Sequence, residues 1–199
     1  GWSETLVSVL MNEGIPARAQ TRTGYFSTTE VETVLSLLSV IDNPMQDIPL
    51  AAVLRSPVVG MSDDEMAWMM ASYKKNTKKG QDRGVYGAWK LWEEEREHPG
   101  LREALEHPGG AFENETGDSE DAVRIGAAVV PVEQAALIWK KLEDFGALLK
   151  ELRTEARYRP IHELLYYVYR RSRYYDYVSA MPAGEIRRGN LDMLVEKAA

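Results

Sequence analysis

The residues best suited to bind a polyanion lie in a short basic run, YKKNTKKGQDR, at residues 73–83. Its lysines are Lys74, Lys75, Lys78 and Lys79. Lysine side chains on an exposed segment contact phosphates without a preference for base sequence. The alternative is a solvated connection between two helices, and the pattern leaves both interpretations open.

A second segment, RPIHELLYYVYRRSRYYDYV at residues 159–178, interleaves tyrosines with arginines. Bases stack on aromatic rings and guanidinium groups pair with phosphates, so this segment could form a nucleic-acid surface. Helical spacing also predicts an apolar stripe made of Ile161, Leu164, Leu165 and Val168. Tyr166, Tyr167 and Tyr169 flank that stripe, where rings lie against neighbouring helices and keep their hydroxyls near water. Packing is therefore the favoured role of these tyrosines.

Catalytic chemistry finds little support in the residues. The sequence contains neither the phosphate loop Gly-x-x-x-x-Gly-Lys-[Ser/Thr] nor Gly-x-Gly-x-x-Gly, and it contains no cysteine. His98, His107 and His162 are too widely spaced to indicate a metal site. The acidic groups at residues 62–65 and 93–97 fit a helix cap and a solvated helix face. We therefore predict no catalytic, cofactor-binding or metal site in this chain.

Composition limits the partners. The 199 residues carry a formal charge of −7, which argues against a protein that coats DNA or an anionic membrane over its whole surface. The charge is uneven, since residues 150–199 have a balance of +3 and residues 1–149 a balance of −10. The absence of cysteine, of a signal peptide and of an apolar run long enough to span a bilayer predicts a cytoplasmic protein without membrane association. A start at Gly1-Trp2 without methionine suggests a fragment of a longer protein.

The elements that must position these residues read mainly as helices. We predict one short strand in GIPARAQ (14–20), after a helix over residues 2–12. Capping boxes, Ser27 with Glu30 and Ser62 with Glu65, predict two helix starts. A polar acidic loop is expected near residues 107–123, followed by a long helix from about 131 to 158, one helix through the tyrosine-rich segment, and a last helix over 186–198. The predicted fold class is mostly α, a helical bundle with a short flanking strand.

Two segments give the chain a family resemblance. Residues 14–66 contain GIP, YFSTTEV, VIDNPMQD and LRSPVVGMSDDEM, and the end of the chain reads YYDYVSAMPAGEIRRGNLDMLVEKA. These phrases resemble the superfamily 1 helicases of the UvrD/PcrA/Rep/RecB group, where the second RecA-like domain (2A) gives way to its inserted 2B subdomain. The wording is most similar to the AddA family, the helicase/nuclease subunits of the Firmicute AddAB complexes.

The resemblance implies an arrangement of domains and a parent activity. Residues 1–30 would be the edge of domain 2A, residues 31–185 the helical 2B-like subdomain, and residues 186–199 a return helix toward 2A. The parent would be an ATP-dependent 3'-5' DNA helicase with exonuclease activity in recombinational repair of double-strand breaks. It would use ATP and magnesium, bind single-stranded and duplex junctions of DNA, and pair with an AddB-type subunit. This piece would be non-catalytic and hold no cofactor; the alternative is a helical protein-interaction module without DNA contact.

Site residues also follow from the resemblance. Gly60, Met61 and Ser62 match the element with which the relatives' 2B subdomain touches duplex DNA, although Ser62 replaces a glycine and acidic residues follow it. Such an element works by presenting backbone amides at a helix N-terminus to a phosphate. Tyr25, Phe26 and Glu30, in the segment 25–31, match the family's motif that seats 2B on the motor domain, which is a structural role.

Overall fold

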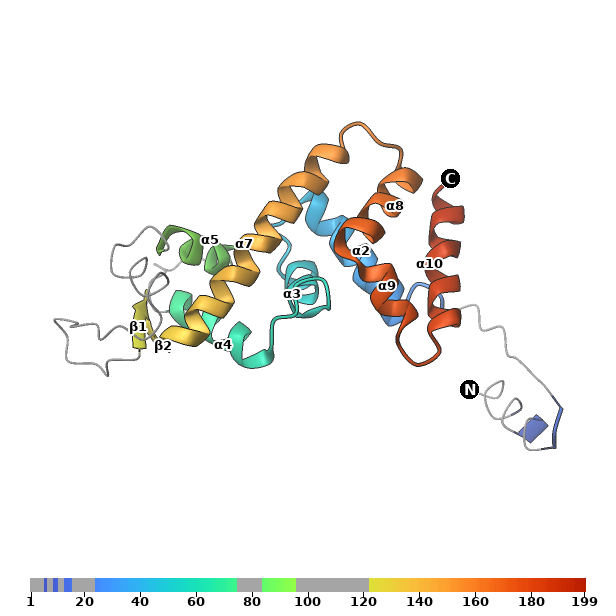
Figure 1. Cartoon of the computed structure of the whole chain (residues 1–199), viewed down its shortest axis with the longest axis horizontal. Coiled ribbons are helices and arrows are strands. Elements are labelled where there is room, and N and C mark those ends of the chain that lie inside the picture. Colours follow the sequence, from blue (N-terminus) through green and yellow to red (C-terminus); the bar gives the residue numbers. More distant parts are fainter. Residues whose placement is uncertain (1–5, 7–8, 11–12, 16–23, 75–83, 96–121) are drawn as a thin grey trace.

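A computed structural model describes residues 6, 9–10, 13–15, 24–74, 84–95 and 122–199. Helices dominate these residues, which confirms the mostly α fold class (Figure 1). The elements, in chain order, are α2 (Thr29–Asp42), α3 (Asp47–Arg55), α4 (Asp63–Lys74), α5 (Gly84–Glu95), β1 (Ala122–Ile125), β2 (Ala128–Pro131), α7 (Val132–Glu155), α8 (Ile161–Ser172), α9 (Tyr174–Ser179) and α10 (Gly184–Ala198). The predicted division into 1–30, 31–185 and 186–199 stays a prediction.

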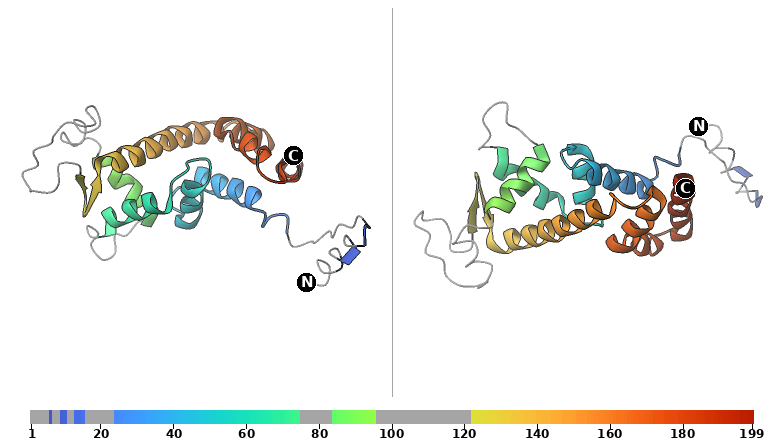
Figure 2. Two further views of the ribbon diagram at one scale, coloured as in Figure 1. Left: turned by 60° about the horizontal axis from the view of Figure 1, so that its bottom comes forward. Right: turned by 90° about the horizontal axis from the view of Figure 1, so that it is seen from above.

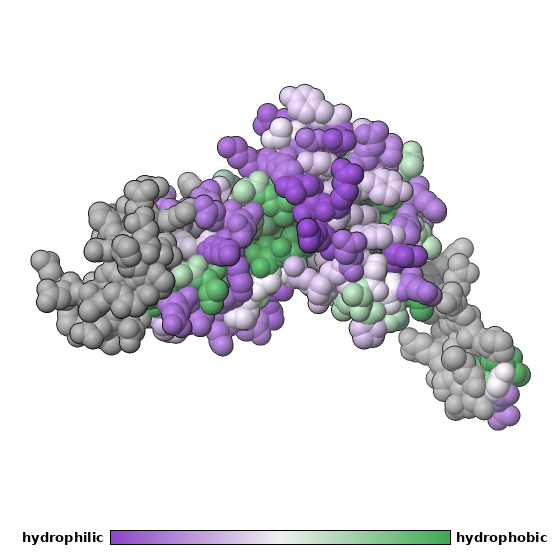
Figure 3. All heavy atoms as spheres, in the orientation of Figure 1, coloured by the Kyte–Doolittle hydropathy of each residue, from purple (hydrophilic) through white to green (hydrophobic). Residues whose placement is uncertain are grey.

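Helix α7 is the longest element and joins the two ends of an elongated molecule (Figures 1 and 2). Its predicted apolar stripe is buried, including Ile138, Leu142 and Leu152. Helices α4 and α5 and strand β2 contact it, as do α2 and α8. Most of the surface in Figure 3 is hydrophilic around a small apolar area. The sequence pattern therefore located the core face of this helix correctly.

A β-hairpin precedes α7, at a place where the sequence predicts an acidic loop running directly into the helix. Strands β1 and β2 pair antiparallel, with Val123 opposite Val130. Gly126 has φ +52, and a Cβ there would lie 2.6 Å from the Ser72 carbonyl oxygen. Buried Ile125 and Val130 attach the hairpin to the helices around it. Predicting helices alone after a single strand was wrong, because tertiary contacts stabilise two strands of four residues each.

The strand predicted in GIPARAQ falls mostly on residues 16–23, outside the described part of the chain. Gly14 and Ile15 are described and are not in a strand; Gly14 has φ +73. The amide of Ile15 donates to the Leu10 carbonyl at 2.9 Å, as expected where a helix ends at a left-handed glycine. Leu6, Val9 and Leu10 are helical, as predicted for residues 2–12.

The two capping boxes had different outcomes. Ser62 and Glu65 form theirs: the Ser62 amide donates to Glu65 Oε2 at 2.7 Å, and the Glu65 amide donates to Ser62 Oγ at 3.2 Å. The box predicted for Ser27 and Glu30 is wrong, since Thr28 is the N-cap of α2 and makes no side-chain cap bond. Glu30 instead bonds to side chains of α10, which removes it from capping.

The tyrosine-rich segment forms two helices where one was predicted. Helix α8 ends at Ser172, and α9 begins at Tyr174. Arg173 between them is left-handed, with φ 54 and ψ 17. The Ser172 hydroxyl donates to the Val168 carbonyl at 2.7 Å and accepts the Tyr174 amide at 3.3 Å, which holds the break. Both helices consequently contact α10.

Candidate functional site

The loop predicted to touch DNA lies between α3 and α4. Gly60 has φ +73, and Met61 is buried. The amides of Gly60 and Met61 donate to backbone carbonyls of residues 56 and 54 at 2.7 and 2.9 Å, and the Ser62 amide donates to Glu65. All three predicted amides therefore have acceptors inside the protein, which leaves their hydrogen atoms turned away from solvent partners.

Lys141 of α7 fixes this loop from the other side. Its Nζ donates to the Gly60 carbonyl at 2.7 Å and to both carboxylate oxygens of Glu65 at 2.8 and 2.7 Å. Burial acts to raise the pKa of Glu65, but the hydrogen bonds from Lys141 and Ser62 outweigh it and lower that pKa below its usual value. The loop is thus bound to α7 by a charged group that a sequence pattern of local caps does not reveal.

DNA contact by Gly60, Met61 and Ser62 stays a prediction. The exposed carboxylates of Asp63 and Asp64 follow the loop at the start of α4. Asp63 pairs with Arg55 at 2.5 Å, but both side chains remain more than half exposed, at 79 and 58 %. Negative charge at this position opposes an incoming phosphate.

The basic run can be placed only at its first lysine. Lys74 is the last residue of α4, and Lys75, Lys78 and Lys79 lie outside the described residues. Their contact with phosphate stays a prediction.

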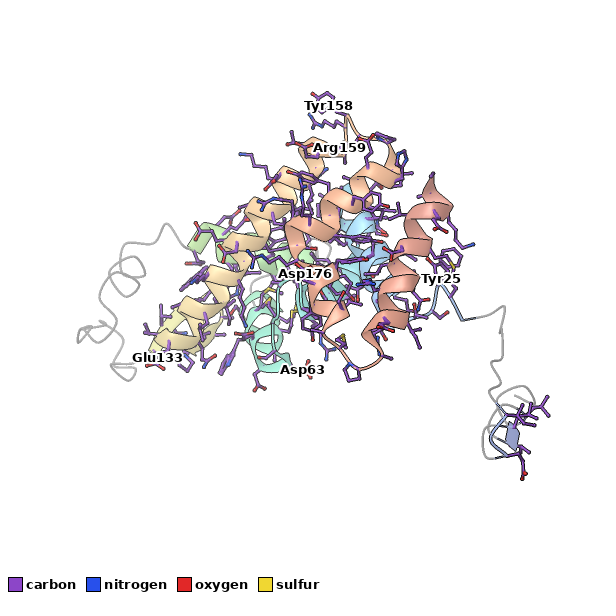
Figure 4. The ribbon with its side chains drawn as sticks, turned by 45° about the vertical axis from the view of Figure 1, so that its right-hand side comes forward. Tyr25, Asp63, Glu133, Tyr158, Arg159 and Asp176 are labelled. Carbon is purple, nitrogen blue, oxygen red and sulfur yellow. The ribbon has the colours of Figure 1, made fainter. Side chains whose placement is uncertain are left out.

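A cluster of polar side chains joins α2 to α10, and we call it the α2–α10 clamp: Tyr25, Glu30, Arg187 and Asn190. Glu30 Oε2 accepts from Arg187 Nη1 at 2.8 Å, and its Oε1 accepts from Asn190 Nδ2 at 2.7 Å. The Tyr25 hydroxyl donates to the Asn190 carbonyl at 2.7 Å. Figure 4 shows Tyr25 beside α10. The clamp joins residues that are about 160 positions apart.

Burial shapes the ionisation of the α2–α10 clamp. The side chain of Glu30 is 4 % exposed, and this burial acts to raise its pKa, yet the Asn190 hydrogen bond and the Arg187 charge hold the pKa below its usual value. Burial, together with the charges of Glu196 and Glu30, raises the pKa of Tyr25 to about 12. Glu30 is therefore a buried carboxylate that stays ionised through its partners. Phe26 is exposed, and the role of this segment in seating the subdomain stays a prediction.

The tyrosines of 159–178 divide between packing and exposure. Tyr169 and Tyr174 are buried, and the Tyr169 hydroxyl donates to the Leu191 carbonyl at 3.1 Å. Tyr167 donates to the Glu151 carboxylate of α7. The packing role is confirmed for these residues, whereas Tyr166 is 58 % exposed.

The described residues also bear on other kinds of site. Within 24–74, 84–95 and 122–199, no three histidine or carboxylate side chains gather as metal ligands. Among the helices of that same part of the chain, none is both long and apolar enough to cross a membrane.

The fold and the α2–α10 clamp define a helical domain whose first and last described helices are tied together. No family model matches the chain. It is 34 % identical to the AddA component of the ATP-dependent helicase/nuclease of Lachnoclostridium phytofermentans, with 100 % of the chain and 14 % of that protein covered. The proteins of the same name from Thermoanaerobacter sp. and Bacillus cereus are each 35 % identical, over 99 % of the chain and 12 and 13 % of their own lengths.

The chain therefore belongs, over its whole length, with one segment of the AddA family of ATP-dependent helicase/nuclease proteins. It spans roughly an eighth of the length of the curated relatives that it matches. This confirms the family resemblance carried by the two end segments.

Proposed function

We propose that this chain is the non-catalytic, 2B-type accessory subdomain of an ATP-dependent DNA helicase/nuclease that acts in the repair of double-strand breaks. The name of the relatives supports the helicase and nuclease activities of the parent. ATP and magnesium would bind to other segments of that parent, because this sequence contains no phosphate loop. The parent would work in the cytoplasm with an AddB-type partner.

The α2–α10 clamp is the observation that carries this proposal. An inserted subdomain has to leave its host close to the point where it enters, so its first and last segments must be neighbours. Tyr25 precedes α2, and Lys197 lies in the last turn of α10, yet Lys197 Nζ lies 5.7 Å from the centre of the Tyr25 ring. The buried Glu30 pairs hold these two segments in a fixed geometry.

A second candidate function is a protein-interaction module that makes no DNA contact. It is favoured by the loop at Gly60–Ser62, whose amides donate within the protein and whose neighbours Asp63 and Asp64 are exposed acids. In that case the helical faces would serve the AddB-type partner. The two candidates differ in whether the chain binds DNA.

A chimera tests the accessory role. In the Bacillus cereus relative, the matched segment would be replaced by this chain, and in a matched control it would be replaced by a short Gly-Ser linker. We expect the chimera to hydrolyse ATP and unwind a forked duplex, and the linker control to lose coupling between the two. Equal unwinding by both proteins would refute an accessory role for the segment.

The purified chain tests the remaining claims. We expect no ATP hydrolysis by the chain alone, since its residues supply no phosphate loop. Fluorescence anisotropy with a labelled forked duplex at low salt then separates the two candidates. Binding that weakens with salt supports the DNA-contacting subdomain, and absence of binding supports the interaction module.

A further inference from the structure

A basic groove lies between α5 and α7, and we call it the α5–α7 groove. It has a volume of about 500 Å³, and its lining includes Tyr86, Lys90, Lys150, Arg153 and Arg157. Its four cationic side chains face one carboxylate, so the formal charge of the lining is +3, in a chain whose formal charge is −7. Figures 1 and 2 show α5 alongside α7. The groove therefore concentrates positive charge that the chain as a whole does not have.

The cations at the C-terminal end of α7 are available to a ligand. Lys150, Arg153 and Arg157 are exposed and recur at intervals of three and four residues, which places them along one face of the helix and its extension. Arg153 makes one long bond, 3.5 Å, to the Asp42 carbonyl. The carboxylates of α7 nearest in sequence have other partners.

Those carboxylates are Glu151 and Glu155. Glu151 accepts two hydrogen bonds from Arg171, and Glu155 accepts one from Arg159 at 2.6 Å. They are thereby turned away from neutralising the groove. In the groove itself, Glu93 is paired with Lys90.

A structural explanation of the basic residues does not account for the whole groove. Cations in the last turn of a helix offset its dipole, and Arg153 fits that role in α7. Lys150 lies before the last turn, however, and Lys90 belongs to a different helix. The convergence of cations from two helices on one groove thus points to an anionic ligand.

Aromatic rings lie beside these charges. Tyr86 is half-buried, and the buried Trp89 ring meets it edge to face with centres 6.0 Å apart. Lys90 Nζ lies 5.7 Å from the Tyr86 ring centre and 5.3 Å from that of Trp89. A half-buried ring beside a cationic groove is the arrangement on which a nucleobase stacks.

We propose that the α5–α7 groove binds the backbone of a DNA strand, with successive phosphates on Lys150, Arg153 and Arg157 and one base against Tyr86. The seven steps from residue 150 to residue 157 rise about 10 Å, at about 1.5 Å each. A DNA strand advances about 3.4 Å per nucleotide along a duplex axis, so that length matches about three nucleotides. This site rests on the proposed function and gives its DNA contact a defined place.

The groove is also distinct from the loop predicted from the sequence. Lys141, which binds Gly60 and Glu65, and Lys150 are nine residues apart on α7, which is about two and a half turns. The two side chains therefore leave opposite faces of the helix. DNA in the groove leaves the Gly60–Ser62 loop and its internal bonds undisturbed.

Two triple variants of the purified chain test the proposal with fluorescein-labelled (dT)20 by anisotropy, from about 50 to 200 mM salt. The groove variant carries Lys150→Gln, Arg153→Gln and Arg157→Gln. The control carries Lys140→Gln, Arg170→Gln and Arg188→Gln, three exposed residues outside the groove, and so has the same formal charge. Circular dichroism checks that both retain the helical fold.

We expect the groove variant to bind at least about tenfold more weakly at the lowest salt concentration. Its plot of log affinity against log salt should become shallower by about 2, because three single-strand phosphate contacts contribute about 0.7 each. The control should retain the steeper slope. Tyr86→Leu should weaken binding without changing the slope, since it removes a stacking surface and no charge.

Three results would overturn the groove. Equal losses in both triple variants would assign binding to the overall charge. Loss only on neutralising Lys74, Lys75, Lys78 and Lys79 would return the contact to the basic run. Absence of (dT)20 binding by the unaltered chain would remove the groove, whereas unwinding by the chimera described above would still support the accessory role.

Discussion

Removing one partner of the α2–α10 clamp should destabilise the whole domain. The perturbation is Arg187→Ala, which leaves the buried Glu30 carboxylate with Asn190 as its remaining side-chain partner in the clamp. Breaking a fully buried ion pair from one side costs about 3–5 kcal/mol of unfolding free energy. The Arg187 side chain is 31 % exposed, so water partly compensates, and we expect about 2–3 kcal/mol.

A double-mutant cycle isolates the interaction itself. Glu30→Ala should cost a similar amount, because it removes two charge-assisted hydrogen bonds, each worth about 1.5–3 kcal/mol, and leaves Arg187 able to turn toward water. The double variant should then lose less than the sum of the two, by about 1–2 kcal/mol. Arg188→Ala is the matched control, since Arg188 is the exposed neighbour of Arg187.

The assay is urea unfolding at neutral pH, followed by circular dichroism and by tryptophan fluorescence. The described tryptophans lie in α4, α5 and α7, at the other end of the molecule from α10, so coincident transitions show that the domain unfolds as one unit. Additive losses within about 0.5 kcal/mol would refute a coupled Glu30–Arg187 pair. A loss in the Arg188→Ala control as large as that in Arg187→Ala would refute the assignment to this pair.

The same variants predict a pH dependence with a defined sign. The pKa of Glu30 in the folded chain lies below its ordinary value of 4.5, so its contribution is fully present above pH 4.5. That contribution should be lost as pH falls below 4.5 through the folded-state pKa. Glu30→Gln should therefore show a smaller loss of stability than the unaltered chain between about pH 5 and pH 3.

Other substitutions give further expectations by the same unfolding assay. Tyr169→Ala should cost about 3 kcal/mol or more, because its ring is buried and its hydroxyl bonds to Leu191, and unchanged stability would contradict the packing role. Lys141→Met should cost about 2 kcal/mol by leaving the buried Glu65 carboxylate without its cation, so a neutral result would show that Ser62 alone suffices. Arg173→Gly should raise stability by about 0.5 kcal/mol, since glycine adopts φ 54 without strain, and a loss would point to an Arg173 contact.

The sequence predicted those parts of the fold that depend on local signals. Pro44 marks the end of α2, the Ser62–Glu65 box starts α4, and the period of apolar residues located the buried face of α7. These signals act within one or two helical turns, where propensity and capping dominate. The hairpin at 122–131 and the break at Arg173 depend on contacts with distant elements, which one local pattern does not specify.

The candidate sites show the same limit. Glu30 was assigned to a cap because Ser27 stands three residues before it, but its partners in the fold are Arg187 and Asn190. The α5–α7 groove was missed although Lys150, Arg153 and Arg157 follow helical spacing, because the face they occupy becomes a groove only when α5 packs beside it. Spacing can identify a basic face; tertiary structure decides whether another helix makes it a binding site.

The contacts also explain why the family resemblance was carried by segments at the two ends of the sequence. The first of them contains Tyr25 and Glu30, and the last contains Arg187 and Asn190, which meet in the α2–α10 clamp. A change in one of these side chains leaves a buried charge or hydroxyl unpaired in the other segment, so their residue types are coupled through the fold. As far as the middle of the chain is described, α4, α5 and the hairpin pack chiefly on one another, on α3 and on α7. Their loops can therefore vary in length and charge without loosening the clamp.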